Sequence, residues 1–311
     1  KQSTAPIEII STVNKPMIAN KSSAAIQISS VDDFGSRSIG HILVSTGRLT
    51  VDEAEEIHRM QRENDVLFGE TGISMGLLSR EDVEFAIARQ FEYSVLKQGD
   101  SAISQELVTA YDPFGPKSEA FRELRTHLLL RWFETERGPK SLSILSAQRG
   151  EGRSYVAANL AVSFSQLGLR TLLIDTDFRN SKLHSYFGVN NRRGLSTLLQ
   201  GKGSSAFFLP VDDIRNLYIL PSGPMPPNPQ ELLSQTYFAD LLKELNQHFD
   251  LLILDTPASL QYSDSTAVSL RSNASIAVAR QGHTKMEELR QMTDRLRRTG
   301  GNILGSVLLE F

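Results

Sequence analysis

A glycine-rich turn over residues 147–154 carries the clearest chemical signal in this sequence. It reads Ala-Gln-Arg-Gly-Glu-Gly-Arg-Ser, and it stands between a short apolar run and a helical pattern. The phosphate-binding pattern G-x-x-x-x-G-K-[ST] has the same layout. Small residues let backbone N–H groups wrap a phosphate, and the start of the following helix adds a favourable dipole. The turn therefore predicts a phosphate site, in which Ser154 ligates Mg²⁺ and Arg153 meets the β- and γ-phosphates.

Three positions of this turn depart from the common pattern. Ala147 replaces the first glycine, and Tyr155 stands where a small hydroxyl residue often contacts the α-phosphate. Arg153 replaces lysine, which keeps the positive charge but makes the side chain longer, planar and forked. A guanidinium group can bind a phosphate through two N–H groups. Taken alone, the turn could also be a tight connection without a ligand.

Carboxylates follow two further apolar runs. Residues 172–174 lead into Asp175 and Asp177, and residues 251–254 lead into Asp255. The carboxyl ends of parallel strands lie at one edge of a sheet, where such carboxylates can hold Mg²⁺ through water. A single aspartate in this place is often only a helix cap. Three expected strands in a row end in such residues, and the glycine-rich turn is the first of these ends. Helix capping alone does not explain this series.

Strands and helices must alternate to position these groups. Short apolar runs bounded by helical stretches predict a mainly parallel sheet flanked by helices, the fold of P-loop NTPases. The helix expected over residues 118–132 places Phe121, Leu124 and Leu128 on one face. The expected strands are residues 141–146, 171–174, 217–220, 251–254, 275–279 and 303–309.

A tandem repeat precedes this α/β pattern. Residues 39–61 and 68–90 align with each other at an offset of 29, and each copy reads as helix, glycine turn and capped helix. We therefore expect a small all-α domain that buries two apolar faces together. The expected organisation is a flexible tail (1–35), the helical tandem-repeat domain (36–97), a linker (98–117) and the P-loop domain (118–311).

Bulk composition excludes several classes of protein. The formal net charge of −3 gives no reason to expect a nucleic-acid partner, and the absence of cysteine excludes disulfides and thiolate metal sites. The sequence shows no apolar run of about 18 residues, the length needed to span a bilayer, and nothing that reads as a signal peptide. We expect a soluble, cytoplasmic protein.

Residues 118–311 resemble the bacterial tyrosine kinases of polysaccharide export systems. Their nucleotide-binding elements match residues 147–154, 172–179 and 251–255. The family motif Glu-x-x-Arg-x-x-Arg matches Glu119, Arg122 and Arg125, and further signatures match residues 226–233, Asp264 and residues 280–284. The branch of chain-length-determinant kinases is the most similar, and there the arginine variant of the phosphate loop is familiar.

This resemblance implies an ATP-dependent tyrosine autokinase that regulates exopolysaccharide chain length, polymerisation or export. Ser154, Asp175 and Asp255 would organise Mg²⁺, Asp177 would be the base for a tyrosyl hydroxyl, and Arg153 would act on the phosphates. The residues implied to bind ATP or ADP are Ala147, Gln148, Arg149, Gly150, Glu151, Gly152, Arg153, Ser154, Tyr155, Asn228 and Arg280.

The resemblance also implies partners. In the family, the strip formed here by Glu119, Arg122 and Arg125 contacts a neighbouring subunit, which implies a homo-oligomer; a solvated charged strip is the alternative. A membrane-bound polysaccharide co-polymerase would recruit the protein to the inner membrane and activate it. The seven tyrosines are scattered at positions 93, 111, 155, 186, 218, 237 and 262.

The tandem repeat resembles MshEN-type domains of type II secretion and pilus-assembly ATPases. Some of those domains bind cyclic di-GMP through an arginine that precedes each Leu-Gly pair, and here Ser38 and Leu67 stand at those positions. A protein-docking role is therefore preferred over cyclic di-GMP binding.

Two other functions stay open for the α/β domain. One is a nucleotide-switched positioning ATPase of the partitioning type, although those proteins often carry a lysine where this chain has Gln148. The other is a non-catalytic scaffold, which the residues Arg153, Tyr155 and Leu309 would favour.

Overall fold

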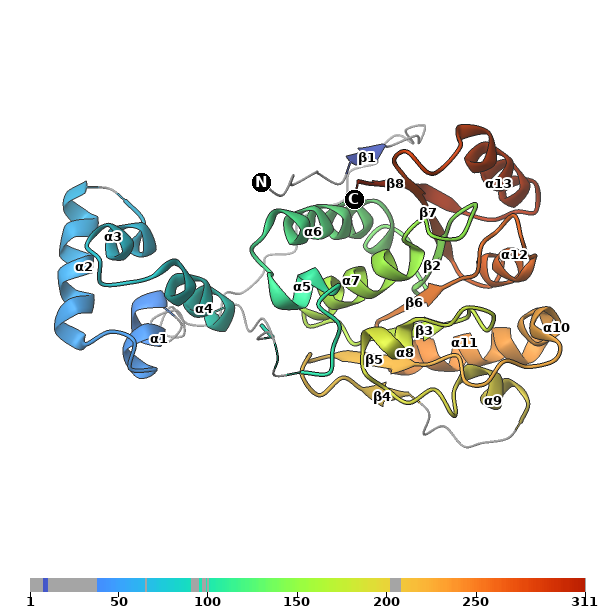
Figure 1. Cartoon of the computed structure of the whole chain (residues 1–311), viewed down its shortest axis with the longest axis horizontal. Helices are drawn as coiled ribbons and strands as arrows, with labels where there is room; N and C mark the ends of the chain where they lie inside the picture. Colours follow the sequence, from blue (N-terminus) through green and yellow to red (C-terminus); the bar gives the residue numbers. More distant parts are fainter. Residues whose placement is uncertain are drawn as a thin grey trace. The chain divides into compact units, whose positions relative to one another are not determined.

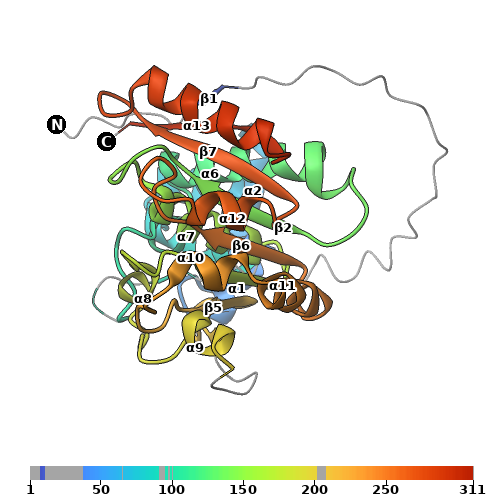
Figure 2. The ribbon, with the colours of Figure 1, turned by 90° about the vertical axis from the view of Figure 1, so that its right-hand side faces the viewer.

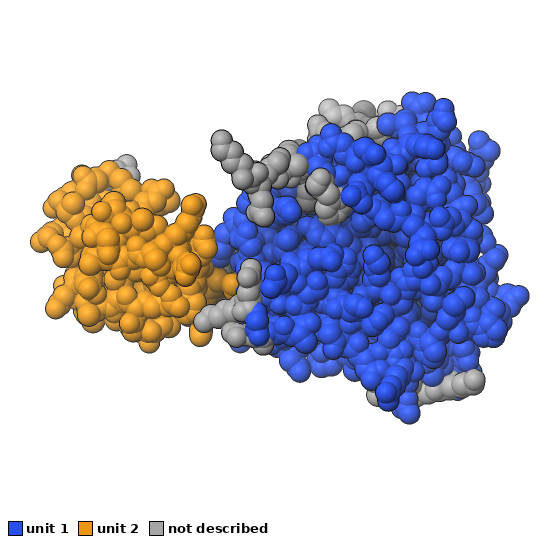
Figure 3. Space-filling view, viewed as in Figure 1, with its two compact units in different colours: residues 1–14, 96–311 blue, residues 15–95 orange. Residues whose placement is uncertain are grey.

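The computed structural model describes residues 8–10, 38–64, 66–90, 95–96, 99, 101–201 and 208–310. It divides into two compact units, which Figure 3 distinguishes by colour. One unit holds Leu96–Phe311 with Lys1–Asn14, and the other holds Lys15–Val95. Apart from one strand, the tail expected over residues 1–35 lies outside the described residues. Within the described part, no helix is both long and apolar enough to span a bilayer.

The larger unit is built on one eight-stranded sheet in the order β1-β8-β7-β2-β6-β3-β5-β4 (Figure 1). Every neighbouring pair is parallel except β1 with β8 and β4 with β5 at the two edges. The six expected strands are all present, which confirms the mainly parallel α/β fold. The strands are β1 (Glu8–Ile10), β2 (Ser141–Leu145), β3 (Thr171–Asp175), β4 (Leu209–Pro210), β5 (Leu217–Leu220), β6 (Leu251–Asp255), β7 (Ala274–Arg280) and β8 (Ile303–Leu309).

Helices cover both faces of this sheet, because alternate strand residues point to opposite sides. In β6, Leu251 and Ile253 join one core, whereas Leu252 and Leu254 join the other. The first core packs under α5 (Val108–Tyr111), α6 (Pro116–Leu128), α7 (Arg153–Ser165) and α8 (Leu183–Tyr186). The opposite face carries α9 (Leu195–Leu199), α10 (Pro229–Ser234), α11 (Thr236–His248), α12 (Asp264–Ser269) and α13 (Met286–Arg298), as Figures 1 and 2 show.

Residues 98–117 differ from the linker that we expected. Ile103, Leu107 and Ala110 are buried in the core under α6 and α7. The side chain of Asn159 in α7 accepts a hydrogen bond from the Thr109 amide (3.1 Å) and donates one to the Glu106 carbonyl (3.0 Å). This segment is therefore part of the α/β unit. The helix expected over 118–132 begins at Pro116 and changes after Leu128 into a π-helical turn, Leu129–Phe133.

The smaller unit contains the expected pair of helical hairpins. Its helices are α1 (Ile39–Ser45), α2 (Val51–Asn64), α3 (Phe68–Ser74) and α4 (Arg80–Gln90), which enclose one apolar cluster. The turns use Gly47 and Gly76 at positive φ (72° and 70°), a conformation that favours glycine. Equivalent capping boxes begin α2 and α4: Thr50 and Ser79 exchange hydrogen bonds with the acidic residue three positions on.

Candidate nucleotide site

The glycine-rich turn connects β2 to α7 and leaves a row of backbone donors without partners. Gly150 and Gly152 adopt left-handed φ angles of 80° and 90° that a side chain would strain. Within the described part of the chain, the N–H groups of residues 149–154 donate no hydrogen bond. The Gln148 N–H differs, because it donates to the Glu151 carboxylate over 2.7 Å. The turn thus presents a run of amides without described partners at the start of a 13-residue helix, as an anion site requires.

Arg153 crosses the inner side of this turn. Its Nε donates to the Thr256 carbonyl (2.7 Å), and its Nη1 donates to the Gln148 carbonyl (2.7 Å) and the Ser146 hydroxyl. The side chain is 8% exposed, and Nη2 has no partner among the described residues. Burial lowers the pKa of Arg153, and the nearby Asp255 carboxylate opposes this shift. The guanidinium therefore joins the phosphate turn to the end of β6 and keeps one nitrogen available.

Two buried carboxylates face each other at the ends of β3 and β6. Asp175 and Asp255 are register partners in the parallel pair, and they are 0% and 1% exposed. Burial raises the pKa of Asp255 to about 7, while the Ser154 hydroxyl and Arg153 partly oppose the shift. Burial, and next the charge of Asp255, raise the pKa of Asp175 well above its usual value.

A cation would fit between these carboxylates. Both oxygens of Asp255 are buried and have no donor in good hydrogen-bond geometry within the described residues, although the Ser154 hydroxyl is close enough to lower the pKa; this arrangement is costly for an ionised group. Asp175, in contrast, accepts hydrogen bonds from the Ser181 hydroxyl (2.8 Å) and the Asp177 amide (3.1 Å). The described residues contain no cluster of three or more His, Cys, Asp or Glu side chains suited to a metal. Two carboxylates with the hydroxyl of Ser154 suit Mg²⁺, which keeps several waters.

Asp177 lies in the loop after β3. Arg179 connects this loop to the segment that follows β6. Oδ1 of Asp177 accepts hydrogen bonds from the amides of Arg179 (3.1 Å) and Asn180 (2.9 Å), and its other oxygen accepts none from described residues. The Arg179 side chain donates to Asp264 (2.8 Å) and lies over the ring of Tyr262, 4.1 Å from its centroid. Sequence reasoning marked Asp264 only as a family signature. The structure shows that it anchors the loop that carries Asp177.

The loop after β7 braces the phosphate turn from outside, a relationship that we did not predict. Arg280 donates from Nη1 to the Gly150 carbonyl (3.1 Å), and His283 Nε2 lies 3.2 Å from the Arg149 carbonyl oxygen. The Thr284 hydroxyl donates to the Glu151 carboxylate over 2.6 Å, and Glu151 is fully buried. Arg280, implied as a nucleotide contact, thus touches the backbone of the turn. One feature of the sequence could have predicted this brace: polar residues directly follow the strand expected over 275–279, at the edge of the sheet where the site lies.

Several implied site residues lie elsewhere. The Tyr155 side chain packs in the core against Phe121, with ring centroids 5.7 Å apart, because its position in α7 faces α6. The Tyr155 side chain therefore points away from the turn, and a nucleotide contact of this residue stays a prediction that its side chain does not support. Ala147 is buried below the turn, and its carbonyl accepts from the Leu260 amide over 3.1 Å. Asn228 is exposed at the start of α10, a helix that contacts α9, α11 and α12.

The charged strip of α6 is only partly as we expected. Glu119 is exposed and forms an ion pair with Arg122, whose side chain is only 19% exposed and also donates to the Pro113 carbonyl. Arg125 instead is 6% exposed and donates from Nη1 to the Ser163 carbonyl of α7 over 2.6 Å. Its spacing of four from Phe121 places it on the buried face of α6. Arg125 thus fastens α6 to α7, which contradicts its expected place on a contact surface.

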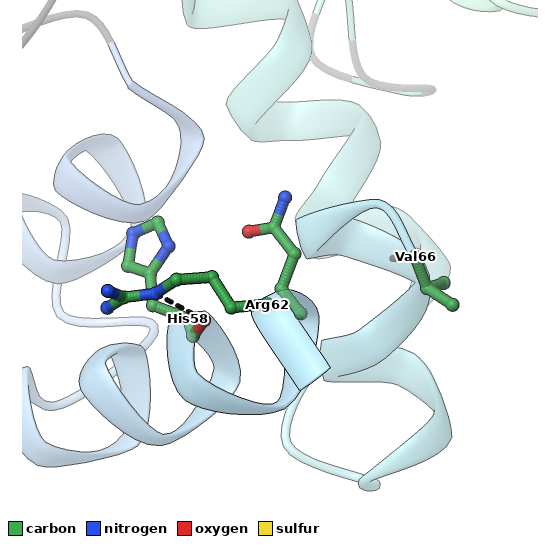
Figure 4. A pocket seen from close by; sticks show the side chains of 4 residues that line it. His58, Arg62 and Val66 are labelled. Atoms are coloured by element: carbon green, nitrogen blue, oxygen red, sulfur yellow. Dashed lines mark hydrogen bonds between the residues drawn. The ribbon is translucent and has the colours of Figure 1, made fainter. Parts of the chain in front are cut away.

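The smaller unit has an open hollow of about 560 Å³, shown in Figure 4. His58, Gln61, Arg62 and Val66 line it, and Arg62 Nε donates to the His58 carbonyl over 3.4 Å. Ser38, at one position of the expected ligand arginines, caps α1 by accepting a hydrogen bond from the His41 amide. Leu67, at the other position, is 68% exposed.

Comparison with known proteins finds one matching family model and several similar tyrosine-protein kinases. Residues 139–302 match the AAA domain family. Tyrosine-protein kinase YwqD of Bacillus subtilis is 34% identical over 212 residues, which span 68% of this chain and 89% of that protein. Putative tyrosine-protein kinase CapB of Staphylococcus aureus is 34% identical over 191 residues, 61% of this chain and 83% of that protein.

A solved kinase domain is similar in structure to about two thirds of this chain. The kinase domain of the Escherichia coli tyrosine kinase ETK superposes with a TM-score of 0.63 at 34% sequence identity. The match covers 66% of this chain and 79% of that chain.

Proposed function

This chain belongs to the bacterial tyrosine-protein kinases, and from that membership we propose that it phosphorylates protein tyrosine with Mg-ATP to regulate exopolysaccharide production. One observation carries the proposal. The free amides of residues 149–154 lie next to a buried pair of carboxylates, one of which has no hydrogen-bond partner in the described residues. Together these features provide an anion site beside a cation site, which is what a magnesium-bound triphosphate needs.

The residues of the chain divide the work of phosphoryl transfer. The amides of residues 149–154 would bind the phosphates, and Nη2 of Arg153 would add positive charge. Ser154, Asp175 and Asp255 would hold Mg²⁺, which when bound neutralises charge on the phosphates. The oxygen of Asp177 that accepts no hydrogen bond from a described residue would take the proton of the tyrosyl hydroxyl. Phosphoryl transfer requires mainly such positioning and neutralisation.

We further propose partners from the sequence resemblance. A membrane-bound polysaccharide co-polymerase would activate the kinase and recruit it to the inner membrane. Copies of the chain would associate through Glu119, which is exposed on α6, and its ion-pair partner Arg122. The helical unit is proposed to dock a protein, with cyclic di-GMP as the alternative occupant of the hollow lined by Arg62.

One observation favours a second candidate, a nucleotide-binding scaffold with little turnover. The guanidinium of Arg153 is held by three groups of the protein, and these bonds must rearrange before all its nitrogens can act on a phosphate.

A phosphorylation assay separates these functions. The full chain would be incubated with Mg-ATP and a tyrosine-containing copolymer, alone and with the cytoplasmic segment of the co-polymerase, while released phosphate is measured in parallel. Phosphotyrosine in the copolymer supports the kinase. Phosphate release without phosphotyrosine supports a positioning ATPase, and nucleotide binding without either product supports the scaffold.

A further inference from the structure

The six tyrosines in the described part of the chain differ in how accessible their hydroxyl groups are. The Tyr111 hydroxyl donates to the Ile103 carbonyl over 2.6 Å, and the Tyr186 hydroxyl donates to Glu106 over 2.8 Å. Burial raises the pKa of Tyr155 to about 12. These three side chains are committed to the fold, because each hydroxyl is bonded or enclosed within the larger core.

Two more tyrosines use their rings in packing. Tyr218 in β5 packs against Phe249 in a T-shaped contact, with ring centroids 5.2 Å apart. The ring of Tyr262 lies under the Arg179 guanidinium, in the contact that anchors the Asp177 loop. Phosphorylation of either side chain would disturb a structural contact.

Tyr237 is the exception within the described residues. It is 50% exposed, and no hydrogen bond or ring contact to another described residue involves it. The next residue, Phe238, is fully buried in the core under α11. Because successive helix residues are about 100° apart, this burial directs Tyr237 away from the core. A phosphate could be added there without moving any packed side chain.

The topology places Tyr237 at the active edge of the sheet. Two residues separate α11 (Thr236–His248) from β6, and the helix packs against that strand. Because the connection is so short, the helix runs antiparallel to β6. Its first turn, which contains Tyr237, therefore lies toward the carboxyl end of β6, where Asp255 stands. This turn contains no acidic residue, and a helix N-terminus tolerates added negative charge.

We propose that Tyr237 accepts the γ-phosphoryl group from the nucleotide site of a second copy of the chain. The inference rests on the proposed kinase function. α11 and α7 cover opposite faces of the sheet, and the buried Phe238 fixes the first turn of α11, which favours transfer from another copy over transfer within one chain. In the step, the Tyr237 oxygen forms a bond to the γ-phosphorus while the bond to the β–γ bridging oxygen breaks. ADP leaves with that electron pair, and the phenolic proton passes to Asp177 of the copy that holds ATP.

The first experiment maps the modified residue. The full chain and its Tyr237→Phe variant are each incubated with Mg-ATP and the tyrosine copolymer, and the sites are identified by peptide mass spectrometry. We expect Tyr237→Phe to lose most of the phosphate incorporated into the chain while copolymer phosphorylation is unchanged. Tyr218→Phe is the matched control, which should keep both activities.

The outcomes separate this inference from the proposed function. Copolymer phosphorylation with the chain modified at Tyr93 or another residue instead of Tyr237 overturns the inference alone. Loss of both readouts in the unsubstituted chain overturns the kinase function, and the inference with it.

A second experiment tests transfer between copies. An affinity-tagged Asp177→Asn chain, which keeps Tyr237, is mixed with the untagged, active Tyr237→Phe chain. Phosphate should appear at Tyr237 of the tagged chain and be lost when that chain also carries Tyr237→Phe. Phosphorylation of Tyr237 at a rate independent of protein concentration, with an unlabelled tagged chain, would show transfer within one copy and contradict the proposal.

Discussion

Thr284 donates a hydrogen bond from its hydroxyl to the buried carboxylate of Glu151 over 2.6 Å, and so ties the loop after β7 to the middle of the phosphate turn. The same carboxylate accepts the Gln148 amide over 2.7 Å. Glu151 therefore stabilises the turn from behind, while the amides of residues 149–154 stay free for a ligand. The shape of the proposed anion site thus depends on a residue that lies 133 positions after Glu151 in the chain.

Loss of this hydrogen bond should weaken nucleotide binding. In Thr284→Val the buried Glu151 carboxylate loses its hydroxyl donor, and a hydrogen bond to a charged group contributes about 1.5–3 kcal/mol. We expect the affinity for Mg-ADP to fall by roughly tenfold, the equivalent of about 1.4 kcal/mol. Calorimetric titration measures this change, and Thr284→Ser should restore binding. Equal affinities of Thr284→Val and the unsubstituted chain would show that the turn does not need the brace.

Replacement of Asp177 should stop phosphoryl transfer and leave the fold intact. The proposed proton acceptor is the Asp177 oxygen to which no described residue donates, and loss of a general base lowers rates by about 10²–10⁴-fold. Copolymer phosphorylation by Asp177→Asn measures the loss, and a thermal unfolding scan checks the fold. Asp294→Asn, on an exposed position of α13, is the control that should keep full activity. Normal transfer by Asp177→Asn would remove the proposed base.

The buried carboxylate pair should make stability depend on pH. Burial raises the pKa of Asp255 to about 7, so between its ordinary range and about 7 the folded protein holds a proton that the unfolded chain has released. Stability should therefore fall as pH rises through this window and level off above it. Asp175, whose pKa is also raised, acts in the same direction.

Denaturant titrations across this window, with the metal chelated, measure the pH dependence. Mg²⁺ should flatten the slope, because a cation stabilises the ionised pair. Asp255→Asn should reduce the slope and also abolish the effect of Mg²⁺. A slope of the opposite sign, or one unchanged in Asp255→Asn, would contradict the assignment.

Arg122 and Arg125 should have separable effects although they belong to one sequence motif. Arg125→Ala removes a buried hydrogen bond to α7 and should destabilise the fold by about 1–3 kcal/mol. Arg122→Ala removes an ion pair with the exposed Glu119, a type of contact worth about 0–1 kcal/mol, and a hydrogen bond to the Pro113 carbonyl. Denaturation measures the first effect. Sedimentation should show that Arg122→Ala weakens association between copies, and unchanged association would remove the proposed contact surface.

The sheet and its carboxylates could be predicted because their signals are local. Each strand is a short apolar run, and Asp175 and Asp255 directly follow two of them, so parallel pairing alone brings them together. The brace by Thr284 could not be predicted, since it joins segments far apart in the chain. The burial of Arg125 could have been predicted from its four-residue spacing from Phe121. The family motif led us instead to place it on the surface. The direction of the Tyr155 side chain could not be predicted, because the motif fixes only the position of this residue on α7.

The segment before α6 shows the opposite error. Its glycines and prolines suggested a linker, while Ile103 and Leu107, four residues apart, belong to the core. The polar turn residues drew attention away from this short apolar pattern, whose side chains are buried by packing against α7.

The hydrogen bonds between Asn159 and the segment at Glu106 and Thr109 also define where the catalytic unit can be cut. A fragment that starts at residue 118 would leave the fully buried side chain of Asn159 without these partners and expose apolar surface on α7. The shortest fragment that keeps its interior closed should therefore start near residue 96, where the larger compact unit resumes. Weak nucleotide binding by a shorter fragment would then reflect a damaged helix rather than a deficient phosphate site.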